Sequence, residues 1–316
     1  MSSAPERLAE QLRPTLDAVI ARVSEVILGK EKQIRLALAC LLARGHLLIE
    51  DLPGVGKTTL AHVLAQVLGL DFNRIQFTSD LLPADILGVS VYNTESQEFR
   101  FHPGPIFVQL VLADEINRAT PKTQSALLEA MEERQVTSDG STQRLPQPFF
   151  VIATQNPRHL IGTFPLPESQ LDRFLMRIEM GYPDRKAERA LLKGRDRREL
   201  LAVMEALIDG EDLVALQQRV GQVHCSEALL DYVQDLIVHT RGSKLFTNGL
   251  SPRAGLALMH SAQAWALLEG RDMVLPEDVQ AVAPSVMGHR LRPAEGGAEE
   301  SAELRIERLL ASVPIP

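Results

Sequence analysis

Residues 47–60 constrain what this chain can fold into more than any other segment. They contain an apolar run, a turn rich in proline and glycine, and the triplet Gly56-Lys57-Thr58 at the start of an amphipathic stretch. This order predicts a β-strand, a phosphate-binding loop and an α-helix. In such a loop, backbone N–H groups approach phosphate oxygens, and the helix N-terminus adds its dipole and its unpaired donors.

One position departs from the strict pattern G-x-x-x-x-G-K-[ST], because Asp51 replaces the first glycine. We interpret the segment as a variant loop, since Gly54 and Gly56 keep the turn permissive. Lys57 would then reach the β- and γ-phosphates, and the hydroxyl of Thr58 would hold Mg²⁺. The alternative is a chance Gly-Lys-Thr in an ordinary turn, which the strand and helix on the correct sides disfavour.

Acidic residues follow a second apolar strand. Residues 110–113 are wholly apolar, which suits a parallel sheet covered on both faces, and Asp114-Glu115 come directly after them. Because such sheets bind ligands at the carboxyl ends of their strands, Asp114 would reach Mg²⁺ and Glu115 would polarise a water molecule. The alternative is a pair of solvated carboxylates, and the phosphate loop upstream makes that interpretation less favourable.

A third buried strand is predicted at residues 149–154, and Gln155-Asn156-Pro157 follow it. Beside the acidic strand, Asn156 would orient the attacking water or touch the γ-phosphate. Alternatively, it caps a turn before Pro157. Taken alone, the sequence favours the turn.

Two arginines gain importance only from this context. Arg173 ends a short helix that starts at Pro167, a place where an arginine is most often a surface or salt-bridge residue. Arg253 lies in the first turn of a later helix, where a cation opposes the helix dipole. A structural salt bridge or a nucleotide phosphate would offset that cost equally well.

The remaining segments surround this framework. Two further strands are predicted at 74–77 and 175–178, and polar hairpins within 83–105 and 135–145, the second around Asp139-Gly140. Thr120-Pro121 predicts the cap and first turn of a helix that runs to Arg134. A domain boundary is predicted at 181–183, where the strand signal ends. Helices are expected at 6–28, 31–43, 184–193, 196–208, 211–220, 226–240, 252–269 and 276–287, then a flexible acidic linker at 293–301 and a last helix at 302–313.

Composition narrows the function further. The 316 residues suffice for two domains, and a net charge of −8 argues against broad attraction to nucleic acid or anionic lipid. The two cysteines, Cys40 and Cys225, stand far apart in no metal-binding or redox spacing, which suits a reducing compartment. No apolar run reaches the ~20 residues of a membrane span. We therefore expect a cytoplasmic protein with no nucleic-acid partner.

Taken in order, these segments resemble the MoxR family of AAA+ ATPases over roughly residues 8–292. The resemblance rests on the stretches 50–58, 113–119, 121–133, 153–157, 165–174 and 251–254. It implies an α/β fold: a three-layer P-loop NTPase domain with a five-stranded parallel sheet, followed by an all-α lid domain. The implied limits are 1–182 for the ATPase core, 183–292 for the lid, and 293–316 for the linker and C-terminal helix.

The resemblance also assigns roles. It implies a Walker A motif at 51–58, a Walker B motif at 110–115, sensor 1 at Asn156, an arginine finger at Arg173 supplied to a neighbouring subunit, and sensor 2 at Arg253, closing the lid over the same chain's loop. The cofactors are ATP and Mg²⁺, the latter held by Thr58 and Asp114. The catalytic set is Lys57, Glu115, Asn156, Arg173 and Arg253. The nucleotide-binding set is Ile27, Gly29, Pro53, Gly54, Val55, Gly56, Lys57, Thr58 and Thr59, with Ile27 and Gly29 at the adenine pocket.

The implied assembly is a homo-oligomeric ring, a hexamer, with a helix-2 insert near 86–103 and a pre-sensor-1 hairpin near 135–147 facing the pore and a partner. Family members act as chaperone-like remodellers beside von Willebrand A domain proteins, and assist the assembly or metallation of other complexes. The client is unidentified.

Three other functions remain open at this stage. A nucleotide-gated scaffold with slow hydrolysis has the same motifs. A DNA motor is disfavoured by the acidic charge, the few aromatics, and the absence from the sequence of a recognisable helix-turn-helix or zinc module. A small-molecule kinase would not need the lid together with Asn156 and Arg173.

Overall fold

The computed structural model describes residues 4–315 except 96, 139, 157–162, 194–196 and 295–300. At its centre lies a five-stranded sheet in the order β2-β5-β8-β1-β9, and every neighbouring pair is parallel. The strands are β1 (Leu47–Glu50), β2 (Phe72–Gln76), β5 (Leu110–Asp114), β8 (Phe150–Gln155) and β9 (Met176–Ile178). The predicted five-stranded parallel sheet is therefore confirmed.

The wholly apolar strands are explained by burial of both faces. Leu47, Ile49 and Leu112 belong to one hydrophobic cluster, while the alternate residues Leu48 and Val111 belong to a second cluster on the opposite face. Because side chains alternate along a strand, a sheet covered on both sides needs apolar residues at every position. The carboxyl edge that follows these strands carries the polar residues of the candidate site.

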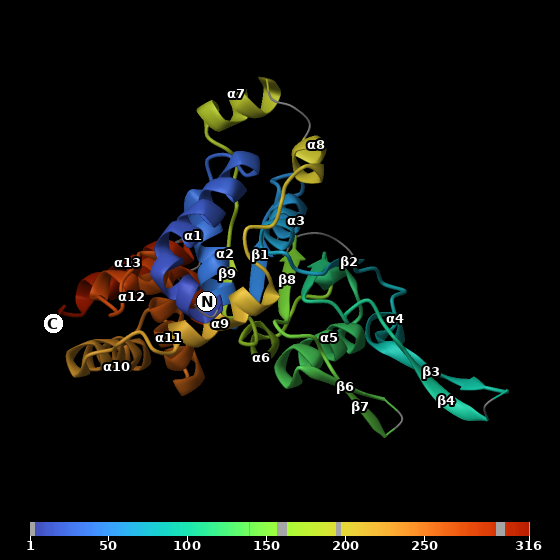
Figure 1. Cartoon of the computed structure of the whole chain (residues 1–316). Helices are drawn as coiled ribbons and strands as arrows, with labels where there is room; N and C mark the ends of the chain where they lie inside the picture. The colour runs from blue at the N-terminus through green and yellow to red at the C-terminus, as the bar shows by residue number, and fades with distance from the viewer. Residues whose placement is uncertain are drawn as a thin grey trace.

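Helices cover each face of the sheet (Figure 1). The first cluster joins three helices of the N-terminal half to the C-terminal helices in one continuous core, and the second includes the apolar side of α5 (Pro121–Glu133). The helices of the first side are α1 (Ala4–Val26), α2 (Glu31–Leu42), α3 (Lys57–Val67), α9 (Gly210–Val220), α10 (Glu227–Gly242), α11 (Pro252–Leu268), α12 (Pro276–Met287) and α13 (Ala302–Ser312). Two more helices, α7 (Arg185–Lys193) and α8 (Arg197–Ala202), lead into this region.

The helical lid region was predicted correctly. The helix expected at 196–208 is shorter than predicted, because α8 ends at Ala202. The limits 182/183 and 292/293 stay a prediction, because the core of the lid is continuous with α1 and α2. Of the expected acidic linker, residues 295–300 lie outside the described part of the chain. Among the described helices, none combines the length and apolar character needed to cross a bilayer.

Two hairpins extend from the same side of the molecule, beyond α5 (Figure 1). They pair β3 (Gly88–Asn93) with β4 (Glu98–Pro103) and β6 (Gln135–Ser138) with β7 (Ser141–Arg144). The first hairpin lies within the expected segment 83–105, but the sequence did not predict the short helix α4 (Pro83–Leu87) that precedes it. Pro83 suits a first helical position, and the Asp85 carboxylate accepts a hydrogen bond from the Leu82 N–H at 2.8 Å. Asp139, expected in the second turn, lies outside the described residues.

Two local predictions need correction. Thr120 precedes α5 as expected, but its hydroxyl lies 3.2 Å from the Thr123 hydroxyl and does not cap a backbone N–H. The short helix α6 (Glu168–Leu171) ends before Arg173, so this arginine lies in the turn between α6 and β9. We call residues 172–175 the finger turn.

Candidate active site

The loop between β1 and α3 has the backbone that a phosphate-binding loop requires. Gly54 and Gly56 have φ values of 85° and 96°, in the left-handed region that side chains disfavour. A Cβ built at either glycine would meet no described atom within 4 Å, so the space in front of the loop is open. Gly56 is the N-cap of α3, which directs its free N–H groups toward that space. The loop therefore fits an anion such as a phosphate group.

Asp51 has a structural role that explains the variant first position. Its carboxylate accepts hydrogen bonds from the N–H groups of Leu52, at 2.7 Å, and Gly181, at 2.6 Å. Its backbone carbonyl accepts from the Lys57 ammonium at 2.5 Å. Asp51 thus fastens the phosphate loop to the chain that leaves β9, a contact a glycine would lack.

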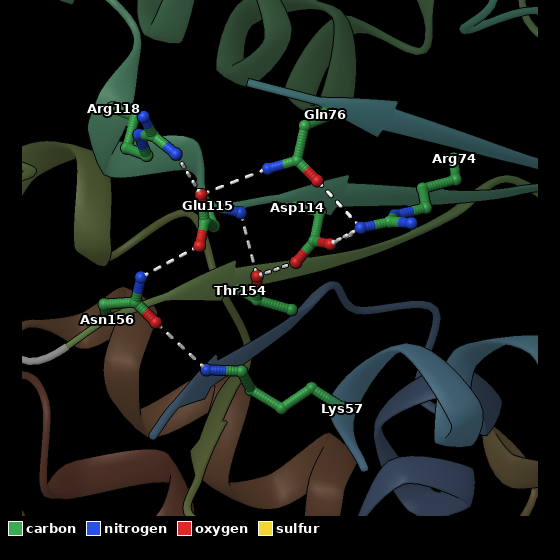
Figure 2. A network of polar contacts seen from close by, with 8 residues as sticks. All are labelled: Lys57, Arg74, Gln76, Asp114, Glu115, Arg118, Thr154 and Asn156. Carbon is green, nitrogen blue, oxygen red and sulfur yellow. Dashed lines mark hydrogen bonds and ion pairs between the residues drawn. The ribbon is translucent and has the colours of Figure 1, made fainter. Parts of the chain in front are cut away.

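Lys57 lies at one end of the polar network, next to Asn156 (Figure 2). The side chain is buried, and its Nζ lies 3.4 Å from Oδ1 of Asn156. Burial lowers the pKa of Lys57, while the negative charges of Asp51, Asp114 and Glu115 raise it. An ammonium group held by the Asp51 carbonyl and the Asn156 amide oxygen, beside an open anion cradle, is suited to bind phosphate oxygens.

Asp114, at the end of β5, is a buried carboxylate with two partners. The Thr154 hydroxyl donates to its Oδ1 at 2.6 Å, and the Arg74 guanidinium donates to its Oδ2 at 2.6 and 3.0 Å. Arg74 lies on β2, whose Gln76 is in register with Asp114. Carboxylate and hydroxyl oxygens are the ligands that Mg²⁺ prefers, so Asp114 and Thr58 fit the predicted metal by their chemistry.

The backbone of Glu115 has a positive φ of 56°, and four hydrogen bonds fix the orientation of the residue (Figure 2). Its N–H donates to the Thr154 hydroxyl at 2.9 Å, and its carboxylate accepts from Arg118 at 2.8 Å, Gln76 at 3.1 Å and Asn156 at 3.1 Å. The hydrogen bond from Arg118 is the main cause that lowers the pKa of Glu115, and Asn156 lowers it further against the effect of burial. The carboxylate is therefore kept ionised and can orient and polarise a water molecule.

A single hydrogen-bonded chain thus joins Lys57, Asn156 and Glu115. Glu115 and Asn156 follow the neighbouring strands β5 and β8, and Lys57 begins α3. Four of its supporting residues were not assigned roles from the sequence: Arg74, Gln76, Arg118 and Thr154. Gln76 and Thr154 carried a usable signal, because each lies at the carboxyl end of a strand. Arg74 carried no such signal, because its contact with Asp114 depends on β2 lying beside β5 in the sheet.

The two predicted arginines lie together at a second cluster. The Glu132 carboxylate, at the end of α5, pairs with Nε of Arg173 at 3.3 Å and with Nη1 of Arg253 at 3.0 Å. Arg173 also donates to the backbone carbonyl of Leu128 at 2.7 Å, and Nε of Arg253 lies 3.9 Å from Asp172. We call these residues the Glu132 cluster. The salt bridge that could offset the helix dipole at Arg253 is therefore formed.

The Glu132 cluster borders a cavity of about 280 Å³. Its lining contains more cations than carboxylates: Arg44, Arg134, Arg173, Arg253 and Arg290 against Glu132 and Asp172. Lys57, Glu115 and Asn156 do not line this cavity. The structure therefore brings Arg253 to Arg173, and not to the phosphate loop of the same chain, where sensor 2 was expected to close. There Arg253 pairs with Glu132, an ion pair that is partly exposed to solvent.

The roles of the remaining nucleotide-binding candidates stay predictions. Ile27 is buried in the first hydrophobic cluster. Gly29 has a φ of 69°, and a Cβ there would lie 3.0 Å from Cβ of Ala187 in α7. Pro53 and Val55 belong to the loop itself, while Thr58 and Thr59 lie in the first turn of α3.

Comparison with known proteins agrees with this geometry. The sequence model of the ATPase family associated with various cellular activities (AAA) matches residues 46–176, and that of the AAA lid domain matches residues 238–309. Chaperone MoxR1 of Mycobacterium tuberculosis is 41% identical over 98% of this chain and 85% of its own length, and Protein MoxR of Paracoccus denitrificans is 35% identical over 94% and 95%. The chain belongs to the MoxR family of AAA ATPases.

Other relatives also match this MoxR-family ATPase over nearly its whole length. The uncharacterized protein YeaC of Bacillus subtilis is 47% identical over 97% of both chains. A crystal structure of a protein from Cytophaga hutchinsonii, proposed to be an ATPase, superposes with a TM-score of 0.89 and 36% identity over 98% of both chains. The sequence-based identification of family and fold is thus confirmed, and with it the assignment as an ATP-binding ATPase.

Proposed function

We propose that this MoxR-family chain forms a ring in which each ATP-hydrolysing site is shared between two adjacent subunits. The observation that carries the proposal is the separation of two functional clusters in one chain. Lys57, Asn156 and Glu115 form one, and Arg173 and Arg253 share the Glu132 carboxylate in the other. A chain with its arginines away from its own phosphate loop is suited to supply them to a neighbour's loop.

Each residue of the first cluster has a defined task in this scheme. Lys57 binds the phosphate oxygens, and Asn156 holds the Glu115 carboxylate toward the attacking water. Glu115 accepts a hydrogen bond from that water and polarises it. Thr58 and Asp114 would hold Mg²⁺, which supplies charge neutralisation at the phosphates when bound.

The second cluster would add positive charge to that of Lys57 at the shared site. Arg173 stabilises the charge that develops on the neighbour's γ-phosphate, a contribution of about 10³–10⁵ in rate for arginine fingers of related NTPases. Arg253 would act beside it, because both arginines meet at Glu132. This revises the sequence-based expectation that Arg253 completes the site of its own chain.

The replacement Glu115→Gln tests the catalytic assignment. The variant should bind ATP and assemble, because Lys57 and the loop are intact, yet turnover should fall by at least about 10²-fold through loss of the polarising carboxylate. Turnover and bound nucleotide can be measured on the same sample. Arg118→Gln is a useful comparison, since it removes only one hydrogen bond to Glu115. An undiminished rate in Glu115→Gln would contradict the catalytic role.

We further propose a chaperone-like role in the assembly or metal and cofactor maturation of partner complexes. It is supported by the relative named as a chaperone and by the β3–β4 hairpin, where Val89, Val91, Tyr92 and Phe99 are exposed. The proposed partners are a von Willebrand A domain protein and a protein client, and the proposed ring is a hexamer. A cytoplasmic location stays a prediction.

The alternative scaffold function can be separated from remodelling by one experiment. Proteins retained by Glu115→Gln in ATP would identify the client. If the wild-type ring changes the client's conformation only while ATP is hydrolysed, remodelling is supported. If Glu115→Gln and wild type act equally on the client, the scaffold is the correct function.

A further inference from the structure

A lid residue, Arg290, holds the backbone on both sides of Arg173. Arg290 follows α12, and its side chain is only 6% exposed. Its Nε donates to the Asp172 carboxylate at 2.6 Å, and Nη2 donates to the carbonyls of Asp172, at 3.2 Å, and Phe174, at 2.8 Å. Nη1 donates to the Leu175 carbonyl at 3.1 Å and to the carbonyl of Val286. Every N–H direction of the guanidinium is therefore used, and three of its four partner residues belong to the finger turn.

Burying the Arg290 guanidinium costs solvation free energy, and its hydrogen bonds offset that cost. Burial lowers the pKa of Arg290, while the hydrogen bond and charge of Asp172 oppose that effect. A buried guanidinium without partners would be strongly unfavourable, so its geometry is fixed by the carbonyls that accept its donors. His289, the preceding residue, adds a contact between its Nε2 and the Phe174 carbonyl at 3.1 Å.

The finger turn is also fixed from the other side by the ATPase core. Arg173 itself donates to the Leu128 carbonyl and pairs with Glu132, both on α5, and the Leu175 N–H donates to the His46 carbonyl at 2.9 Å. Residues 172–175 therefore lie at a joint between the core and the lid. Any shift of the lid must move the turn or break the hydrogen bonds of Arg290.

We infer that Arg290 is a positioning residue for the reaction: it sets the place of Arg173 and transmits the position of the lid to the site of the adjacent subunit. The inference rests on the proposed function, because it assumes that Arg173 acts on a neighbour. The N–H groups of Arg290 are used within its own chain, which leaves none for a nucleotide. Its effect is to keep the Arg173 backbone in the geometry from which the guanidinium reaches across the interface.

The replacement Arg290→Met tests this role. It removes the donors and keeps an unbranched side chain of similar length, so the finger turn loses its lid contacts. A displacement of about 1 Å in a catalytic group costs about 10²-fold, and we expect turnover to fall by that factor. Nucleotide affinity and KM should stay near the wild-type values, because the phosphate loop of the same chain is untouched.

Mixing experiments separate positioning from simple loss of structure. Arg290→Met subunits keep their own loop, so mixing with Lys57→Ala subunits, which keep a normal finger, should restore hydrolysis. Mixing Arg290→Met with Arg173→Ala should restore none, because neither partner supplies a finger. Absence of rescue by Lys57→Ala, or rescue by Arg173→Ala, would overturn the inference.

Matched variants complete the test. Arg292→Met removes a nearby, more exposed lid contact, to Glu168 of α6, without touching the finger turn, and it should keep turnover within about twofold, as expected for an exposed pair. Arg290→Lys retains the charge but not the planar fork, so it should show a smaller loss with the same pattern of rescue, and it replaces Arg290→Met if that variant does not fold. Wild-type turnover in Arg290→Lys would contradict the need for the fork.

The outcome for Arg290 can be told apart from the outcome for the shared site. If Arg173→Ala alone hydrolyses ATP at the wild-type rate, the proposed role of Arg173 fails. If Arg173→Ala is inactive and rescued by Lys57→Ala, but Arg290→Met is not rescued, the shared site stands and the positioning role falls.

Discussion

Replacing Asp51 by glycine would restore the strict phosphate-loop pattern, and the structure predicts that this change is harmful. The Asp51 carboxylate accepts two backbone hydrogen bonds, from Leu52 at 2.7 Å and from Gly181 at 2.6 Å. Hydrogen bonds to a charged group contribute about 1.5–3 kcal/mol each. The Leu52 contact is exposed and therefore weaker. Glycine also makes the unfolded chain more flexible, which lowers the free energy of unfolding by a further ~0.5–1 kcal/mol. The sum is about 3 kcal/mol in the free energy of unfolding.

The assay compares thermal unfolding and nucleotide binding in Asp51→Gly, Asp51→Asn and wild type. Asp51→Gly should lower Tm by about 5 °C or more. Asp51→Asn keeps one acceptor oxygen, so its loss should be intermediate. Nucleotide binding should persist in both, because Lys57 bonds to the backbone carbonyl of residue 51. A Tm for Asp51→Gly equal to or above that of wild type would refute the assigned role of the carboxylate.

Two further predictions concern buried polar groups. Burial lowers the pKa of His46 from 6.5 to about 4, so below pH 6.5 the unfolded chain binds a proton that the folded chain does not. This residue should lower the free energy of unfolding by about 2 kcal/mol between pH 6.5 and 5. Burial also lowers the pKa of His289, so His46→Asn should show a shallower pH slope than wild type in urea unfolding. Equal pH slopes for the two proteins would contradict this. Asn156→Ala removes a hydrogen bond to Glu115 and the contact with Lys57. Turnover should fall by about 10²-fold while ATP affinity is retained. An unchanged steady-state rate of ATP hydrolysis would exclude a role of Asn156 in orienting Glu115.

Local sequence patterns predicted much of the fold, because the spacing of apolar residues along the chain reflects which side chains are buried. Apolar runs at 47–49 and 110–113 had to be strands covered on both faces, and the polar residues after them had to meet at one edge. The helix α4 was missed because five residues, among them Pro83 and Asp85, form only one turn, which no periodicity reveals.

The supporting contacts of the site could not be predicted for a different reason. Arg74 reaches Asp114 only because β2 is the neighbour of β5 in the sheet. The residues of a strand do not by themselves predict which strands lie beside it. Arg290 contacts a turn that lies more than 100 residues earlier in the chain. Arg253 meets Glu132 only once the lid is packed on the core. These are tertiary contacts between residues that carry no common motif.

The claim of a shared site is tested most directly by mixing Lys57→Ala subunits with Arg173→Ala subunits and measuring ATP turnover at several ratios. Each variant alone lacks one half of every site. In mixed rings, some interfaces combine an intact loop from an Arg173→Ala subunit with an intact arginine from a Lys57→Ala subunit. The account predicts turnover well above the sum of the two separate rates, greatest at intermediate ratios. Turnover that never exceeds that sum, in rings shown to exchange subunits, would contradict it.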